Sequence, residues 1–310
     1  MGPTMSRPRG DARPNDQMTM RAKRCILNAD DFGGSRSINE AIMKAHTEGL
    51  LTSCSLMVSG AAVEEAARFA REHPSLGVGL HLVLVCGKAV LPPQEIPHLV
   101  DGQGRLSAHP LAAGLRYFCS KAAQQELRRE IDAQFAKLFA ANLRCSHVDS
   151  HFHMHVHPAV FDLVLEAAAR FDVTRLRLPN EELSLHLRLS RHWPPDLLTA
   201  ATHRMLYRRN VQRARERGFL VAERVYGLLQ TNRLDEAYLC HLLPHLGGQT
   251  NEIYCHPDTA TARGTGELQA LLSPKAAETV ARLGLQLTNY AELEGPPQAP
   301  GRRKGGDRGR

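Results

Sequence analysis

The stretch Cys145-Ser-His-Val-Asp-Ser-His-Phe-His-Met-His-Val-His157 carries the strongest structural signal of the chain. Five of the 16 histidines lie within it, and together with Asp149 they occupy every second position from His147 to His157. Alternate side chains of a β-strand share one face, so an extended chain places these imidazoles and the carboxylate on one side. Neutral imidazole is a common ligand of zinc and similar divalent ions, which favours a metal site. The alternative is a polar strand end with solvated histidines.

Short apolar runs and amphipathic helices alternate on both sides of this stretch. The predicted strands lie at 24–28, 51–58, 76–83, 174–179, 248–257 and 285–289, and the predicted helices at 37–49, 61–72, 124–142 and 158–171. Reactive side chains follow several of the strands. This pattern predicts an α/β fold, a distorted or incomplete (β/α) TIM-like barrel in a single domain with inserted loops. The proline-rich segment 86–120 is the longest loop insertion, and it lies where substrate-covering segments are often found.

The predicted barrel domain spans residues 24–294. The leader 1–23 and the basic tail 295–310 are rich in proline, glycine and arginine, and we expect both to be disordered. No apolar run is long enough to span a membrane, and the N-terminus lacks a secretion signal, which favours a soluble cytoplasmic protein. Seven cysteines without a Cys-x-x-Cys pair argue against a disulfide framework or a thiolate zinc site, and they fit a reducing compartment.

Chemically reactive side chains come at the ends of three further predicted strands. Asp30 and Asp31 follow strand 24–28, where one acid can bind a cation while the other faces a reacting water; the alternative is an exposed acidic turn that caps the next helix. His81 lies among apolar residues, where a lone histidine is more often structural than a ligand. His256 precedes a proline, a position that suits an acid/base role. Asp31, His81 and the histidine-rich stretch together favour one shared metal site.

An arginine-rich segment at about 184–220 interrupts the strand–helix pattern. Residues 186–217 hold eight arginines and two acidic residues among scattered apolar side chains. Such a basic helical segment could contact a membrane surface or a lipidic substrate, and the alternative is an ordinary solvated outer helix. Nucleic-acid binding is not expected, because the segment has little aromatic interleaving and no recognisable motif.

Four segments resemble the signature segments of the YdjC-like carbohydrate deacetylases. They are Asn28-Ala-Asp-Asp-Phe-Gly33, Gly79-Leu-His-Leu82, His147-Val-Asp-Ser-His-Phe-His153 and Cys255-His-Pro257. The resemblance runs in order through residues 24–294. Arg175-Leu-Arg-Leu-Pro-Asn-Glu181 and the insert after it are most similar to the hopanoid-biosynthesis-associated branch, whose members are thought to act on an N-acetylglucosaminyl hopanoid.

The resemblance implies one divalent metal ion bound by one aspartate and two histidines. By position the ligands are Asp31, His81 and His151; Zn²⁺ is the first choice, and Mg²⁺, Mn²⁺ or Co²⁺ are the others. Asp30 matches the general base of the family, His256 the general acid, and Arg177 the arginine that orients the base. The resemblance then places Asp149, His153 and His155 around the metal ligands as neighbours.

The implied activity is metal-dependent removal of an N-acetyl group from an N-acetylglucosamine-type amino sugar. The resemblance favours a hopanoid glycolipid as substrate. The composition of residues 186–217 separately suggests peripheral contact at the inner face of the membrane. One alternative is deacetylation of soluble chitooligosaccharides, for which a lipid-contacting surface is unnecessary. Another is a non-catalytic metal- or sugar-binding protein, in which Asp30 and His256 have no role. The sequence leaves the oligomeric state open, a homodimer included.

Overall fold

The protein is described here by a computed structural model of residues 22–189 and 197–294. The leader and tail predicted to be disordered, apart from residues 22 and 23, lie outside the described residues. The strands are β1 (Arg24–Phe32), β2 (Ser53–Leu56), β3 (Gly77–Leu82), β4 (Val148–Ser150), β5 (Arg224–Tyr226), β6 (Thr250–Cys255) and β7 (Gln286–Thr288). The α-helices are α1 (Arg36–Glu48), α2 (Val63–Glu72), α3 (Pro110–Cys119), α4 (Lys121–Ala140), α5 (Phe161–Arg170), α6 (Leu183–Leu189), α7 (Leu197–Glu216), α8 (Glu236–Leu242), α9 (Ala262–Leu271) and α10 (Pro274–Arg282). The short 3₁₀ helices are η1 (His151–Val156), η2 (Leu243–His245) and η3 (Tyr290–Glu292).

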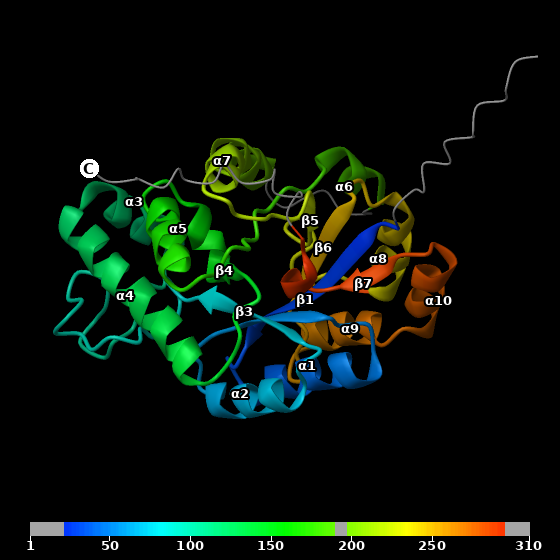
Figure 1. Ribbon diagram of the computed structural model, residues 1–310, viewed down its shortest axis with the longest axis horizontal. Helices are drawn as coiled ribbons and strands as arrows, with labels where there is room; N and C mark the ends of the chain where they lie inside the picture. Colours follow the sequence, from blue (N-terminus) through cyan, green and yellow to red (C-terminus); the bar gives the residue numbers. More distant parts are fainter. Residues whose placement is uncertain (1–21, 190–196, 295–310) are drawn as a thin grey trace, which may run out of the picture.

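The named strands form one parallel sheet in the order β4-β3-β2-β1-β6-β5, and β7 pairs with the start of β1. Parallel bridges between Val148 and Leu176 and between Arg175 and Leu220 extend the pairing past β4, toward the segment that precedes β5. The sheet therefore curls into a half-barrel, with helices around its outer side (Figure 1). This arrangement fits the predicted incomplete TIM-like barrel.

The two faces of the curled sheet differ in chemistry. Leu27, Cys54, Leu80 and Ile253 face outward and belong to the main apolar core, which also contains side chains of α1, α2, α4 and α5. The alternate positions face the concave side, where Asn28, Ser55, His81, Asp149 and Glu252 are buried. A polar network therefore fills the inside of the half-barrel, and burial of the apolar outer face against the helices stabilises it.

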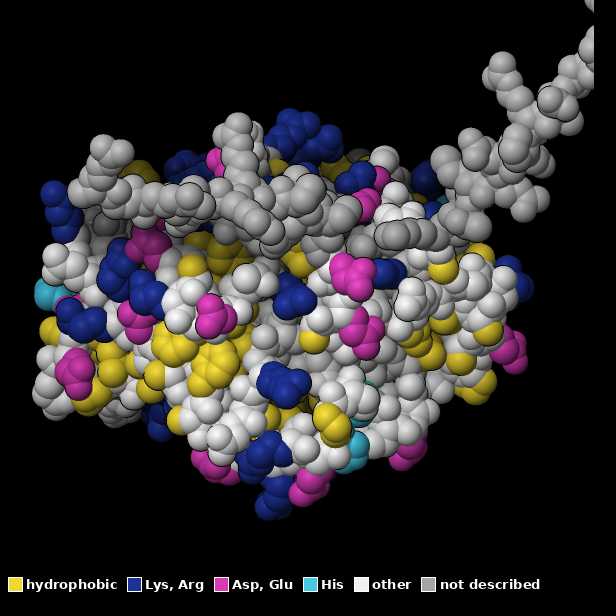
Figure 2. All heavy atoms as spheres, in the orientation of Figure 1, with side chains coloured by type: hydrophobic (Ala, Val, Ile, Leu, Met, Phe, Trp, Pro, Cys, Tyr) yellow, Lys and Arg dark blue, Asp and Glu magenta, His cyan; other side chains and the backbone are white. Residues whose placement is uncertain are grey.

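Local capping fixes where the surrounding helices begin. The hydroxyl of Ser35 accepts a hydrogen bond from the backbone N–H of Ile38 at the start of α1, and Ser120 and Ser273 cap α4 and α10 in the same way. The helices α3 and α5 both pack on α4, which contacts β3. Hydrophobic, basic and acidic side chains are interspersed on the surface of this half of the molecule (Figure 2). No described helix combines the length and apolarity needed to cross a membrane.

Four of the predicted elements differ from the structure. The segment 86–120, predicted as a loop, contains the helix α3. The histidine-rich stretch is not one strand: β4 ends at Ser150, and η1 follows, so the five imidazoles do not share a face. The predicted strand at 174–179 forms only isolated bridges. The first strand is longer than predicted, because β1 continues through Asp30 and Asp31 to Phe32. The strand β5 was not predicted, since three residues carry little periodic signal.

Candidate metal centre and active site

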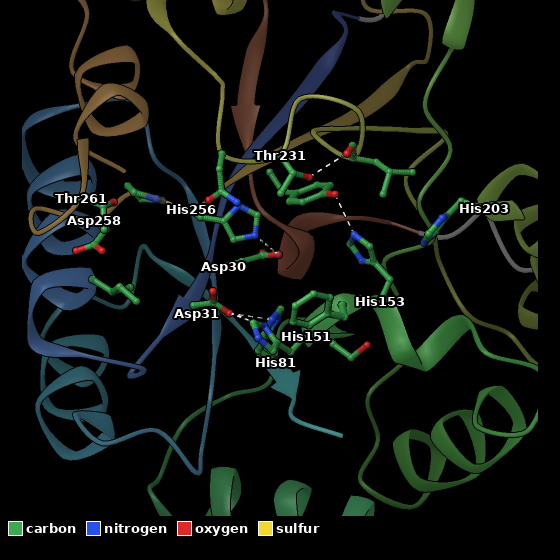
Figure 3. Close-up of a pocket in the computed structure, with 17 residues that line it drawn as sticks. Asp30, Asp31, His81, His151, His153, His203, Thr231, His256, Asp258 and Thr261 are labelled. Atoms are coloured by element: carbon green, nitrogen blue, oxygen red, sulfur yellow. Dashed lines mark hydrogen bonds and ion pairs between the residues drawn. The ribbon is translucent and has the colours of Figure 1, made fainter. Parts of the chain in front are cut away.

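Three side chains from different parts of the sequence converge at the carboxyl-terminal end of the sheet. Asp31 lies near the end of β1, His81 lies in β3, and His151 directly follows β4. Oδ1 of Asp31 lies 3.2 Å from Nε2 of His81 and 3.0 Å from Nδ1 of His151, and Figure 3 shows the three side chains directed toward one another. Ligand atoms bound at about 2.0–2.2 Å to one zinc ion lie about 3 Å apart. These separations suit a shared divalent cation.

A second group of possible ligands is already neutralised by the protein. Asp30, His81 and Asp149 also bring ligand atoms close together. However, Nη1 of Arg177 lies 2.8 Å from Oδ2 of Asp30 and 2.7 Å from Oδ2 of Asp149, so a positive charge lies between these carboxylates. The group around Asp31 is therefore the better candidate, and its one carboxylate and two imidazoles suit zinc and related divalent ions.

Asp149 determines how His81 is oriented. Nδ1 of His81 donates a hydrogen bond of 2.8 Å to Oδ1 of Asp149, which directs Nε2 toward Asp31. This is the usual way in which a carboxylate holds a metal-binding histidine. Burial lowers the pKa of His81, but the Asp149 carboxylate outweighs this effect and, with Asp31, raises the pKa to about 10. The surrounding carboxylates thus favour a positive charge at this position.

The adjacent acids Asp30 and Asp31 point in different directions because of the backbone between them. Asp31 has a φ of 65°, in the left-handed region that few residues other than glycine adopt. Its carbonyl accepts a hydrogen bond from the backbone N–H of Gly34, which forms a tight turn after the strand. The Asp31 carboxylate therefore faces the two histidines, while Asp30 points into the interior of the half-barrel.

Arg177 holds the carboxylate of Asp30 in a fixed orientation. Its Nη1 and Nη2 each donate a hydrogen bond of 2.8 Å to one oxygen of Asp30, and Asn28 donates a third, of 2.9 Å, to Oδ1. Arg177 is completely buried and also contacts Asp149 and Glu252, so one guanidinium serves three carboxylates. The Tyr254 ring lies 4.6 Å from the guanidinium carbon. Such a network leaves the Asp30 side chain little rotational freedom.

A cavity of about 460 Å³ opens over these groups. Asp30, Asp31, His81, His151 and His256 all line it, and Nε2 of His256 lies 3.9 Å from Oδ2 of Asp30. The remaining polar lining includes Ser150, His153, His203, Thr231, Asn232, Tyr254, Asp258 and Thr261. The structure thus brings together the predicted metal ligands and the predicted acid and base on one accessible surface (Figure 3).

His147 and His155 are structural parts of the interior. Nδ1 of His147 lies 2.9 Å from Oγ of Ser146, and its ring stacks on Tyr290. This ring also lies across Gly79, where an added Cβ would be 2.3 Å from Cε1. His155 lies between the hydroxyl of Ser150 and the carbonyl of Arg177. Burial lowers the pKa of each histidine to about 4, so both are neutral near pH 7.

The backbone beside the candidate ligand His151 is strained. Phe152 and His153 have φ values of 54° and 52°, both in the left-handed region, which costs about 1 kcal/mol or more for such residues. The turn leaves the Phe152 ring 57% exposed at the cavity, and it brings Nε2 of His153 within 2.9 Å of the Tyr254 hydroxyl. This turn of the backbone at Phe152 and His153 explains why, of the five histidines in the run, only His151 reaches the candidate metal site.

Sequence reasoning missed two residues of the network, Glu252 and Tyr254. Glu252, Tyr254 and His256 occupy every second position along β6 and just after it. This spacing of polar side chains in a buried strand could have indicated that all three face the interior. Burial raises the pKa of Glu252 despite its contacts with Arg177 and the Tyr290 hydroxyl.

Comparison with known proteins agrees with this geometry. Residues 24–282 match the family described as YdjC-like protein. A carbohydrate deacetylase of Geobacillus stearothermophilus is 32% identical over 281 residues, which cover 87% of this chain and 97% of that protein. A chitooligosaccharide deacetylase of Serratia marcescens is 30% identical over 278 residues, covering 87% and 99% of the two chains.

A solved structure supports the fold alone. The crystal structure of a proposed cellobiose-phosphate cleavage protein of Enterococcus faecalis superposes with a TM-score of 0.66 at 24% identity, and it covers 87% of this chain and 98% of that one. The relatives confirm the sequence-based prediction of a deacetylase-type hydrolase. With a family match over most of its length and two relatives aligned along nearly their whole sequences, the chain belongs to the YdjC-like protein family.

Proposed function

We propose that the protein is a metal-dependent hydrolase that removes the N-acetyl group from an N-acetylglucosamine-type sugar. The observation that carries this proposal is the convergence of Asp31, His81 and His151 beside Asp30 and His256 in one cavity. The names of the Geobacillus and Serratia relatives support the substrate class. A non-catalytic binding protein would need the metal ligands, but it would not need a buried aspartate fixed by an arginine at the cavity floor.

Asp31, His81 and His151 would hold the divalent ion, with Zn²⁺ as the first choice. When bound, such an ion supplies Lewis-acid polarisation of the acetyl carbonyl and stabilises negative charge on its oxygen. Three protein ligands leave room at the ion for small molecules, as hydrolytic zinc sites require.

Asp30 and His256 would move the protons of the reaction. Asp30 accepts a proton from the attacking water, and Arg177 keeps its carboxylate directed at the cavity. His256 then donates a proton to the sugar nitrogen as the C–N bond breaks, so that water and the amide become acetate and the free amine. Acid/base groups of this kind typically contribute about 10²–10⁴-fold each to the rate.

For the natural substrate we favour the N-acetylglucosaminyl hopanoid that the sequence resemblance implies. Support comes from α7, where Leu198 is 74% and Met205 63% exposed beside the exposed Arg204, Arg208 and Arg209. A helix that exposes both apolar and cationic side chains suits peripheral contact with an anionic membrane. All seven cysteines are free thiols, which supports a cytoplasmic location. The second candidate substrate is a soluble chitooligosaccharide, which the Serratia relative favours.

The decisive experiment measures acetate release from N-acetylglucosaminyl hopanoid and from N,N′-diacetylchitobiose by mass spectrometry, with and without a chelator. We expect chelator-sensitive loss of acetyl, faster for the glycolipid. Asp30→Asn should still take up zinc but lose turnover, because the amide cannot accept the water proton. The matched control is Asp235→Asn, at an exposed helix cap where asparagine serves equally well. Full activity of Asp30→Asn would overturn the mechanism.

A further inference from the structure

A second cavity, of about 300 Å³, adjoins the catalytic one. Its described walls come from the 179–181 segment, α6, α7 and the loop after β5: Pro179, Asn180, Glu181, Leu183, Leu197, Ala200, Ala201, His203, Arg204, Leu228 and Leu229. His203 and Leu228 line both cavities, so the two are neighbours across these side chains. The second cavity therefore lies on a side toward which a molecule bound in the catalytic cavity can extend, past His203 and Leu228.

The walls of this second cavity are mainly apolar. Leu197, Ala200, Ala201 and Arg204 recur along α7 at helical spacing, so one face of this helix lines the cavity. The two alanines leave space that a larger side chain would fill, and Leu228 and Leu229 add to the apolar lining. Asn180, Glu181, His203 and Arg204 supply the polar part of the lining, and the larger apolar part favours an apolar group over a second sugar ring.

One acidic group interrupts this apolar lining. Oε2 of Glu181 accepts a hydrogen bond of 2.9 Å from the backbone N–H of Leu229. Oε1 of Glu181 is buried, yet among the described residues it has no hydrogen-bond partner. Burial raises the pKa of this carboxyl to about 7, so near neutral pH it can donate as well as accept a hydrogen bond. A buried polar atom without a partner is costly, and a ligand that supplies the partner relieves that cost.

We propose that the second cavity binds an apolar aglycone of the amino-sugar substrate and that Glu181 hydrogen-bonds a hydroxyl group on this aglycone. The inference rests on the proposed deacetylase function, because the acetamide must occupy the catalytic cavity for the aglycone to reach the second one. It assigns substrate selection to residues outside the reacting centre: the metal site acts on the acetyl group, and the second cavity recognises what the sugar is attached to.

The test compares three glycosides of N-acetylglucosamine: methyl, octyl and 2-hydroxyoctyl. Acetate release gives kcat/KM for each with the zinc-loaded full chain. We expect kcat/KM to rise from methyl to octyl to hydroxyoctyl. Ala200→Phe fills the cavity and should lower the octyl-to-methyl ratio about tenfold or more, chiefly through KM. The matched control Thr202→Phe adds the same bulk at an exposed position of α7 outside the lining, and it should leave that ratio unchanged.

Glu181 is tested through the hydroxyl group itself. Glu181→Leu should abolish the preference for hydroxyoctyl over octyl, a change of about tenfold for one buried hydrogen bond, whereas Glu181→Gln should retain part of it. Two results would overturn the inference while leaving the deacetylase proposal intact. One is an equal kcat/KM for all three glycosides in the wild type. The other is an octyl-to-methyl ratio of kcat/KM in Ala200→Phe equal to that of the wild type.

Failure of the deacetylase proposal has a different signature, the absence of acetate release from every glycoside. Calorimetric binding of octyl glucosaminide to the wild type and to Ala200→Phe tests the cavity independently of turnover. Equal affinity of the two proteins would refute the apolar site.

Discussion

Replacement of Arg177 by methionine should destabilise the folded protein by about 3–5 kcal/mol. The guanidinium lies within 2.7–2.8 Å of oxygens of Asp30, Asp149 and Glu252, and all four side chains are buried. Methionine fills similar space but carries no charge, so the three carboxylates lose their shared partner. Removal of one member of a buried ion pair typically costs about 3–5 kcal/mol because the remaining charge is uncompensated. Here the upper half of that range is expected.

Urea unfolding of the metal-free proteins measures this cost. The control is Arg175→Met, two residues earlier on the same segment, where the described contact is one hydrogen bond of 3.0 Å to the carbonyl of Leu293; its loss should cost about 1 kcal/mol. Adding Glu252→Gln to Arg177→Met removes one of the stranded carboxylates, and it should recover about 1 kcal/mol or more.

Two results would refute the reasoning about Arg177. The first is an unfolding free energy of Arg177→Met within about 1 kcal/mol of the wild type, because the interior would then tolerate its carboxylates without the guanidinium. The second is a further loss of stability on adding Glu252→Gln. That outcome would mean that Glu252 stabilises the fold through its contact with Tyr290 rather than through its charge.

Two further predictions follow from the histidines. Asp149→Asn should weaken zinc binding about 10–100-fold in a chelator competition by removing the carboxylate that orients His81, whereas Asp162→Asn, at a surface ion pair with Arg217, should leave it unchanged. Burial lowers the pKa of His147 to about 4 in the folded state, below its unfolded value of about 6.5, so the unfolded state binds the proton first as pH falls. Between pH 7.5 and 5 this difference should remove about 2 kcal/mol of stability. His147→Gln should eliminate this contribution from the measured dependence of stability on pH. Identical slopes for wild type and His147→Gln would contradict the burial argument.

The site residues that the sequence could place are those whose positions follow from the parallel strands that carry them. Asp30, Asp31 and His81 lie at the ends of predicted parallel strands, and the carboxyl ends of such strands meet at one edge of the sheet. Arg177 lies in a segment read as a strand, and the structure brings it to the same interior even though that segment forms only isolated bridges. Local pattern and general topology were sufficient to place Asp30, Asp31 and His81 near one another, whereas the link of Arg177 to the site came from the family resemblance.

Other features depend on tertiary contacts that no local pattern encodes. Alternation in the histidine run predicted one strand, but the chain turns at Phe152 and His153 through left-handed backbone conformations that neither residue type favours. The hydrogen bonds that bury His155 are made with Ser150 and Arg177, and they become available only once the barrel has formed. The cavity beside Glu181 likewise depends on how α6 and α7 pack against the loop after β5.

The close packing of the His147 ring against Gly79 has a consequence for how sequences of this family can vary. A methyl group at position 79 would overlap the imidazole of His147. The space between the two residues can therefore hold a side chain from position 79 or from position 147, but not from both. Replacement of Gly79 alone should be excluded, whereas a larger residue there becomes acceptable once position 147 carries a small side chain. The two positions should therefore change together, which links two signature segments that are far apart in the sequence and offers a physical criterion for recognising divergent members.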